Sequence, residues 1–226
     1  MYLEQNLKGI CSKNGIDYQQ FLSDLEVDEV HELSIFDLQA IAEEYNIDLM
    51  ALLFKPLAKT VHLQKKIDKI KFLLLDVDGV LTDGGMYMSE NGDQFKKYNT
   101  KDGMGIIHLK KKGIEVGIIS SGFSTTMVKN RADLLGITHC YVGQEPKLAI
   151  LTAWCSELNI KLDEIAIIGD DINDLAVMKN VGLAVCPVDA VNVVKSSSHI
   201  ILSSPGGRGC VREFIDAYLL SEPISI

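Results

Sequence analysis

The most constraining feature of the sequence is a series of short apolar runs that alternate with segments of helical pattern. The runs are 70–75, 114–119, 139–142, 165–168 and 182–185, and the segments between them are 103–112, 127–135, 147–158 and 175–179. Short runs that are mostly apolar are typical of strands buried in a parallel sheet. Their alternation with helices predicts an α/β fold with a mostly parallel, Rossmann-like sheet.

A β-hairpin is expected between the first run and the first helix. Residues 86–89 and 94–98 flank Asn91-Gly92, a dipeptide that favours a tight two-residue turn. The expected hairpin carries several apolar side chains, namely Met86, Met88, Phe95 and Tyr98. An isolated two-stranded hairpin is marginally stable in water, so these side chains predict an interface.

Residues 1–65 differ in composition from residues 66–226, and we expect two domains with this boundary. Residues 1–60 contain four lysines and eleven acidic residues, a net charge of −7. Ser34 and Asp37 have the spacing of a helix capping box, so this part is predicted to be a short helical module. Its pattern also resembles the last helices of a helix-turn-helix domain, but a DNA reader should be basic.

The composition of the whole chain excludes some classes of partner. A net charge of −9 disfavours general binding to nucleic acid or to anionic lipid. No apolar run approaches the about 18–20 residues that a membrane span needs. The five cysteines are scattered, without the spacing of a zinc site, and we interpret them as free thiols of a protein in a reducing cytoplasm.

Acidic residues follow two of the apolar runs directly. Asp76 and Asp78 come after 70–75, at the strand end where open α/β sheets place their ligands. A polar turn is the other explanation of this segment. The run 165–168 is followed by three carboxylates, those of Asp170, Asp171 and Asp174. The helix dipole can account for one or two of them. So many carboxylates at one sheet edge would repel one another, which predicts a hard cation with oxygen ligands.

Two weaker signals lie between these acidic segments. Ser120, Ser121 and Gly122 follow 114–119 and offer hydroxyl and N–H groups for a phosphate, although a helix cap is the better explanation of this segment taken alone. Lys147 precedes the segment 147–158, and taken alone it would be a solvated lysine.

The four segments, in this order, resemble the haloacid dehalogenase superfamily. DVDGVLTDG, a serine after the next strand, a lysine and GDDIND supply the pattern, which covers about residues 68–220. In detail the chain looks like the 3-deoxy-D-manno-octulosonate 8-phosphate phosphatase family. The segments that support this resemblance are TDGGMY, YNTKDGMGI, VGQEPKL and GGRGCVREFIDAYLL. The resemblance implies the haloacid dehalogenase fold and a Mg²⁺-dependent phosphatase that forms an aspartyl-phosphate.

The resemblance also assigns roles to residues. Asp76 would be the nucleophile and Asp78 the general acid and later base, while Ser121, Gly122 and Lys147 would hold the phosphoryl oxygens. The metal ligands would be the Asp76 carboxylate, the Asp78 backbone carbonyl and Asp170. Asp171 and Asp174 would orient the site or supply an alternative ligand. Ser120 is the alternative to Ser121, and Arg208 lies in a glycine-rich tail that would contribute to the substrate pocket.

The spacing leaves no room for a cap domain, because Asp76 and Ser121 are 45 residues apart and Ser121 and Lys147 only 26. In the resembled family a homotetramer covers the open sites, so we expect a homotetramer. Phe123-Ser124 departs from the family pattern, which leaves the sugar open: a 9-phosphate of a nonulosonic acid is the alternative substrate. A phosphotransferase and a ligand-sensing regulatory protein are the alternatives in activity.

Overall fold

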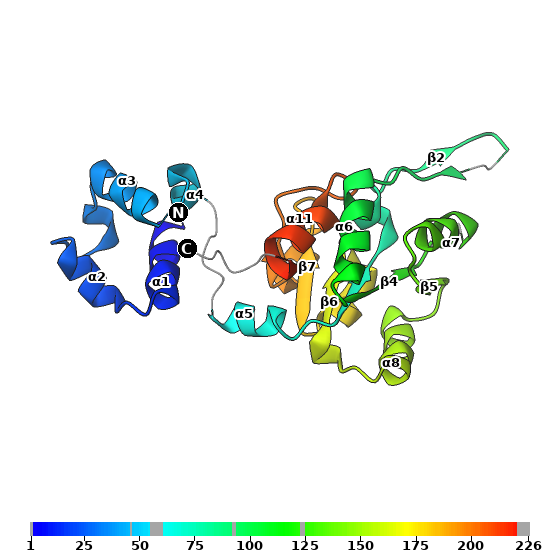
Figure 1. The fold of residues 1–226 in the computed structure, drawn as a ribbon. Coiled ribbons are helices and arrows are strands. Elements are labelled where there is room, and N and C mark those ends of the chain that lie inside the picture. The colour runs from blue at the N-terminus through cyan, green and yellow to red at the C-terminus, as the bar shows by residue number, and fades with distance from the viewer. Residues whose placement is uncertain (1, 46, 55–60, 92–93, 123–124, 221–226) are drawn as a thin grey trace. The chain divides into compact units, whose positions relative to one another are not determined.

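The computed structural model describes residues 2–45, 47–54, 61–91, 94–122 and 125–220 (Figure 1). By its contacts the chain divides into two compact units, one within Met1–Gln64 and the other within Lys65–Ile224. Helix α5, Val61–Ile67, crosses this division. The Lys66 ammonium donates to the Gly182 carbonyl oxygen at 3.0 Å, which ties the end of α5 to the second unit.

The first unit is a small helical bundle with its own core. Its helices are α1 (Leu3–Lys13), α2 (Tyr18–Asp24), α3 (Ile35–Glu44) and α4 (Leu49–Phe54). The predicted capping box is confirmed: Ser34 caps α3, and its hydroxyl and the Asp37 carboxylate exchange hydrogen bonds with each other's backbone N–H. The core includes Leu7, Ile41 and Leu52, all almost fully buried.

The second unit is built on a parallel sheet, as the sequence predicts, and the sheet has a sixth strand, Ile200–Ile201, in addition to the five expected ones. Its strands are β1 (Phe72–Leu75), β4 (Glu115–Ser120), β5 (His139–Val142), β6 (Ile165–Ile168), β7 (Leu183–Cys186) and β8 (Ile200–Ile201). Their order is β5-β4-β1-β6-β7-β8, and each neighbouring pair is parallel. The strand order changes direction between β1 and β6, and open α/β sheets bind their ligands at the carboxyl ends of strands at such a point.

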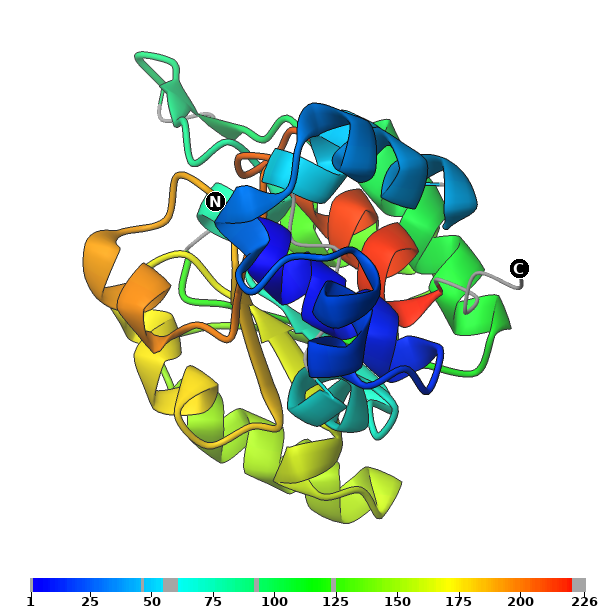
Figure 2. The same cartoon turned by 90° about the vertical axis from the view of Figure 1, so that its left-hand side faces the viewer.

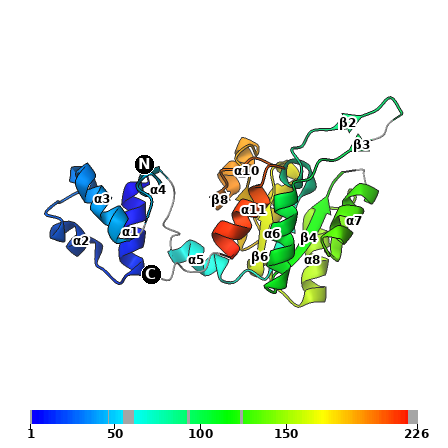
Figure 3. The same ribbon diagram turned by 45° about the horizontal axis from the view of Figure 1, so that its top comes forward.

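Helices cover both faces of this sheet. They are α6 (Thr100–Lys111), α7 (Thr125–Leu134), α8 (Lys147–Leu158), α9 (Leu175–Met178), α10 (Asn192–Ser197) and α11 (Cys210–Phe214). Side chains of α8, α9 and α10 belong to one buried apolar cluster that also contains Phe72 and Leu74 of β1. Helices α6 and α11 pack together on the other side, as Figures 2 and 3 show.

Two helices begin earlier than the apolar pattern indicates. Helix α6 begins at Thr100 rather than at 103, because the Asn99 side chain accepts a hydrogen bond from the Lys101 N–H and caps the helix. Helix α7 begins at Thr125 rather than at 127. Strand β4 includes Ser120, which the sequence placed after the strand, and this serine is buried.

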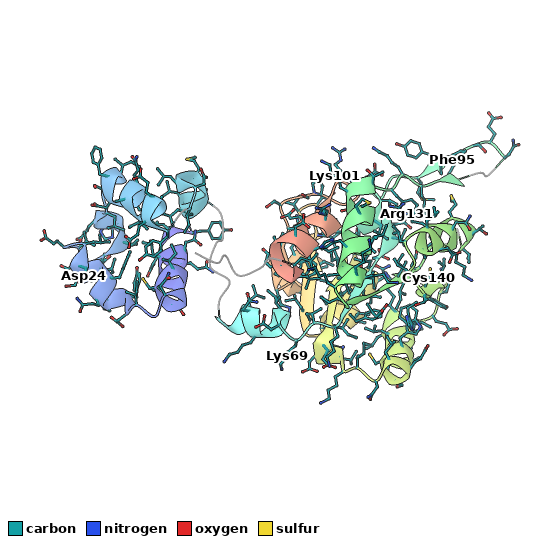
Figure 4. The ribbon with its side chains drawn as sticks, in the orientation of Figure 1. Asp24, Lys69, Phe95, Lys101, Arg131 and Cys140 are labelled. Carbon is teal, nitrogen blue, oxygen red and sulfur yellow. The ribbon has the colours of Figure 1, made fainter. Side chains whose placement is uncertain are left out.

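The predicted hairpin is present, with β2 (Tyr87–Met88) antiparallel to β3 (Gln94–Phe95). It extends away from the sheet, and Figure 4 labels Phe95 on it. Gly92 of the expected Asn-Gly turn lies outside the described residues. Because strand neighbours point to opposite faces, both faces of the hairpin carry an apolar residue. The side chains of Met86, Tyr87, Met88 and Phe95 are 57–67% exposed.

Tyr98 was expected among the exposed apolar side chains of the hairpin, and this was wrong. The hydroxyl of Tyr98 is buried, and the Arg131 guanidinium lies 5.3 Å from the centre of its ring. Tyr98 precedes the Asn99 cap, so the chain has already turned toward the body of the unit at this position.

Among the described residues, no helix is both long enough and apolar enough to cross a membrane.

The separate cores predict that the second unit folds without the first. A chain that begins at Thr60 should keep α5 and unfold cooperatively, with a melting temperature within about 4 °C of the matching transition of the whole chain, or about 1 kcal/mol. Calorimetry of the two chains measures this.

The whole chain with Leu7→Asp is the control. Leu7 is fully buried in the first unit, so this change should abolish only the transition of that unit. An unfolded chain 60–226, or loss of both transitions in the Leu7 variant, would show that the two units fold as one.

Candidate active site

Three neighbouring strands bring the acidic and hydroxyl segments to one edge of the sheet. Leu75, the last residue of β1, is paired with Ile118 of β4 and with Ile168 of β6. The residues that follow these strands therefore emerge side by side. Asp76 continues the ladder, because its N–H donates to the Ile168 carbonyl oxygen at 3.1 Å. Asp76 thus lies between the loop after β4 and the acidic loop after β6.

Lys147, the first residue of α8, lies at the centre of this edge. Its ammonium donates to Asp76 Oδ1 and to Asp174 Oδ1, each at 2.7 Å, and its side chain is only 3% exposed. A solvated lysine was the simple expectation for this residue, and the burial excludes it. Burial lowers the pKa of the Lys147 ammonium, but the charges of the two carboxylates and their hydrogen bonds raise it more, so its pKa lies above the ordinary value. Lys147 is therefore a buried cation.

Asp174 is fixed through both of its carboxylate oxygens. Oδ1 accepts from Lys147, while Oδ2 accepts from the N–H groups of Asp170 at 3.0 Å and of Asp171 at 3.4 Å. Asp171 is exposed, and its own Oδ1 accepts from the Ile172 N–H at 2.7 Å. These contacts make Asp174 an orienting residue of the loop and keep Asp171 on its outer side.

Asp76, Asp170 and Asp174 form a cluster that fits a divalent cation. One oxygen of each lies within 4.8 Å of the others. Together with the Lys147 ammonium, the three carboxylates leave a formal charge of −2. Asp170 Oδ1 is buried and has no hydrogen-bond partner among the described residues. Because a buried carboxylate oxygen needs a partner, this orphaned atom favours a metal ligand at Asp170.

Mutual repulsion and burial change the acidity of the cluster. Burial, followed by the charge of Asp174, raises the pKa of Asp76 from 3.8 to about 7, although Lys147 opposes the shift. Burial, followed by the charges of Asp76 and Asp174, raises the pKa of Asp170 to about 8. A cation bound to this cluster would therefore compete with protons for the carboxylates.

Close backbone approach joins the loop after β1 to the loops around it. Gly79 has φ +83°, and a Cβ at this position would lie 2.0 Å from Asp170 Oδ2. A Cβ on Gly206 would lie 1.9 Å from the Gly79 carbonyl oxygen, and the Gly207 N–H donates to the Val80 carbonyl oxygen at 2.9 Å. The glycine-rich tail is thus packed against the loop after β1 rather than being a loose connection. Arg208 follows it with an exposed side chain.

The serines after β4 occupy different positions. Ser120 is buried, and its hydroxyl accepts from the Gly122 N–H at 3.1 Å. Ser121 is half-buried, with its hydroxyl 3.4 Å from the Asn173 amide nitrogen, and its carbonyl oxygen accepts from Gln144 at 2.7 Å. This arrangement favours Ser121 over Ser120 as the hydroxyl available to a ligand. Phe123 and Ser124 lie outside the described residues.

Asp78 has a partner that sequence reasoning missed. The Lys96 ammonium, from the residue after β3, forms an ion pair with Asp78 Oδ1, and the Thr82 hydroxyl lies 3.4 Å from the same oxygen. The other oxygen faces the serine loop, because a Cβ on Gly122 would lie 3.3 Å from Asp78 Oδ2. Because neighbouring residues of a strand point to opposite faces, the sequence could have predicted that Lys96 and Phe95 lie on different faces. Lys97 obscures this signal, because two adjacent lysines do not show which of them turns inward.

Comparison with known proteins agrees with this geometry. The family described as haloacid dehalogenase-like hydrolase matches residues 105–182. The 3-deoxy-D-manno-octulosonate 8-phosphate phosphatase KdsC of Salmonella typhi is 40% identical over 163 residues, which is 72% of this chain and 86% of that protein.

Two solved structures extend the comparison. The crystal structure of the enzyme of the same name from Yersinia pestis superposes with a TM-score of 0.68 at 38% identity, over 71% of this chain and 86% of that one. The structure of the Moraxella catarrhalis enzyme, in complex with magnesium ion, phosphate ion and KDO, superposes with a TM-score of 0.66 at 35% sequence identity. The match covers 69% of this chain and 89% of that one.

The parallel sheet, with its acidic edge and buried lysine, defines a haloacid dehalogenase-like hydrolase. Within this class, the sequence identity to the Salmonella typhi protein and the share of both chains that it covers identify the family. The chain belongs to the 3-deoxy-D-manno-octulosonate 8-phosphate phosphatase family.

The raised pKa values predict a pH-dependent response to Mg²⁺. Between about pH 4 and pH 8 the folded metal-free protein holds protons on Asp76 and Asp170 that the unfolded chain has lost. Because the folded state binds more protons, its free energy of unfolding should fall as the pH rises through this window. Mg²⁺ competes with those protons, so it should raise the melting temperature more at about pH 8.5 than at about pH 5.5.

At about 100 times its dissociation constant, Mg²⁺ should add about 2.7 kcal/mol, or several degrees in this size class. Thermal unfolding with Mg²⁺ or with a chelator measures the response. Asp170→Asn should lose most of it, whereas Asp133→Asn, an exposed change on α7, should keep it. An equal rise at both pH values would refute the competition between Mg²⁺ and protons.

Proposed function

We propose that this chain is a Mg²⁺-dependent phosphatase that hydrolyses 3-deoxy-D-manno-octulosonate 8-phosphate to the free sugar acid and phosphate. The observation that carries the proposal is the buried arrangement in which Lys147 orients the Asp76 carboxylate beside Asp170. The matches to 3-deoxy-D-manno-octulosonate 8-phosphate phosphatases cover most of the length of those proteins, which supports the choice of substrate.

In the proposed mechanism Asp76 is the nucleophile. Its carboxylate attacks phosphorus, so that an Asp76 O–P bond forms while the ester P–O bond breaks. Asp78 gives a proton to the departing sugar oxygen, and it then takes a proton from the water that attacks the aspartyl-phosphate. Lys147 orients Asp76 and balances charge, and Lys147 and the Ser121 hydroxyl, with Gly122 beside them, bind phosphoryl oxygens.

Asp76, Asp170 and the backbone carbonyl of Asp78 would hold the cation. When bound, Mg²⁺ would offset the repulsion between the carboxylates and the phosphate dianion and polarise the phosphoryl group. Asp174 would keep Lys147 and the acidic loop in place, as the three hydrogen bonds that its carboxylate accepts suggest. Arg208, exposed beside the packed glycines, would reach the sugar acid.

We further propose a homotetramer in which the hairpins meet. The spacing of the site segments leaves no room for a cap domain between them, and the hairpin exposes apolar residues on both faces. A homotetramer would bury these faces and place a neighbouring subunit over each open site.

Phosphate release from a panel of sugar phosphates tests the function. We expect the 8-phosphate of 3-deoxy-octulosonate to be hydrolysed with the highest kcat/KM, ahead of the 9-phosphates of nonulosonic acids, and only with a hard divalent cation. Alcohol acceptors should not capture the phosphoryl group. A higher kcat/KM for a nonulosonate would change the substrate, and transfer to an alcohol would change the reaction class.

The proposed nucleophile predicts that Asp76→Asn lowers turnover by at least about 10³-fold. The amide oxygen can still accept from Lys147, so the melting temperature should stay within about 4 °C. Asp133→Asn, the matched change on the surface, should keep full activity. Turnover within tenfold of wild type would remove Asp76 from the role of nucleophile. A wild type that is inactive on the whole panel would instead favour a ligand-sensing protein.

The proposed assembly predicts that the double variant Met88→Lys and Phe95→Lys dissociates. Two buried ammonium groups would be costly at an apolar interface. Glu90→Lys changes the charge of the same hairpin by the same amount without removing an apolar group, and it should stay tetrameric. Light scattering after size-exclusion chromatography measures both. A monomeric and fully active wild type would refute the assembly, and a dissociated variant with unchanged kcat/KM would refute the covering role of the neighbour.

A further inference from the structure

Among the described residues of the hairpin region, Lys96 is the one whose charged group contacts the site. Its ammonium contacts Asp78 Oδ1, and its side chain is 10% exposed, whereas Phe95 before it is 67% exposed. Lys97 after it is exposed. Lysine side chains normally keep their ammonium in water. The chain therefore buries the charged residue and exposes its apolar neighbour, and the ion pair with Asp78 accounts for the burial of Lys96.

The two oxygens of Asp78 have different surroundings. Oδ1 is held by Lys96 and lies 3.4 Å from the Thr82 hydroxyl. The structure records no hydrogen bond to Oδ2 among the described residues, and this oxygen is directed to the Gly122 backbone, where the phosphoryl group is proposed to bind. Oδ1 is thus occupied by contacts within the protein, and Oδ2 is the atom available to the substrate.

We propose that Lys96 is a positioning residue for proton transfer by Asp78, an inference that rests on the proposed phosphatase function. Lys96 fixes Oδ1, so that Oδ2 carries the proton toward the ester oxygen. As the O–P bond to Asp76 forms and the ester bond breaks, that proton passes from Asp78 Oδ2 to the leaving oxygen. The ammonium of Lys96 then neighbours the carboxylate that remains, and water returns a proton to Oδ2 in the second step.

The dependence of kcat/KM on the leaving group distinguishes a role in proton transfer from a role in phosphate binding or in hairpin stability. A nitrophenolate leaves without a proton, whereas an alkoxide needs one. The parameter kcat/KM covers the steps from substrate binding to formation of the aspartyl-phosphate. It therefore includes the proton donation by Asp78 and excludes the later proton transfer from water. Loss of Lys96 should therefore be severe for alkyl phosphates and slight for nitrophenyl phosphate. A residue that only binds phosphate or supports the hairpin would affect all esters equally.

The experiment measures kcat/KM of the full chain with Mg²⁺ for nitrophenyl, phenyl and alkyl phosphates. Lys96→Met should lose about 10²–10⁴-fold with the alkyl ester and less than about tenfold with the nitrophenyl ester. Lys96→Arg should recover part of the loss with the alkyl ester. The matched control Lys97→Met should remain within about twofold of wild type on every ester, since its side chain is exposed outside the site.

A second comparison uses Asp78→Asn. If Lys96 acts through Asp78, then Lys96→Met should have almost no further effect on the alkyl ester in that background. Equal losses on all esters, no loss, or additive losses with Asp78→Asn would each overturn the proposal while the phosphatase function stands. A wild type inactive on every ester would overturn both. If Lys96→Met does not fold, Lys96→Gln replaces it with the same expectations.

Discussion

A lysine ammonium buried between two carboxylates holds the reactive edge of this protein in place. Lys147 reaches from the first residue of α8 to Asp76 at the end of β1 and to Asp174 after β6, at 2.7 Å in both cases. Removal of one member of a buried ion pair typically costs about 3–5 kcal/mol, because the others are left without compensation. Three segments that are distant in sequence are therefore fixed relative to one another by one charge. The remaining excess of negative charge is what makes the edge suited to a divalent cation.

Sterics add a second constraint, which explains why glycines surround the carboxylates. Gly79 and Gly206 approach Asp170 and each other so closely that a single Cβ would overlap a neighbouring atom. The C-terminal tail is thereby packed on the loop that carries Asp78. Asp102, buried at the start of α6, adds to this by accepting a hydrogen bond from the Arg212 N–H at 2.8 Å, which fixes the helix after the tail. Substrate groups would meet a preformed backbone surface here.

The hairpin connects chemistry with assembly. It presents apolar side chains on both faces to solvent and at the same time places Lys96 on Asp78. If the hairpins of four subunits pack together, the same contacts that stabilise the assembly would hold Lys96 in place. The helical module of residues 2–54 has a core of its own and contributes none of the residues of the acidic edge. Its acidic surface gives no support for the binding of nucleic acid.

The sequence by itself determined the α/β class, the parallel sheet and the bounds of β5 and β6, because the strands of a parallel sheet form short, mostly apolar runs between helical segments. It also identified the acidic residues at the strand ends. It missed the start of α6, which depends on the side chain of Asn99 rather than on apolar spacing. Only the tertiary structure decided that Lys147 is buried, that Tyr98 leaves the hairpin surface and that Lys96 reaches Asp78. Each of these depends on contacts between residues far apart in the chain, and a local pattern carries no information about which distant charge will neutralise a buried one.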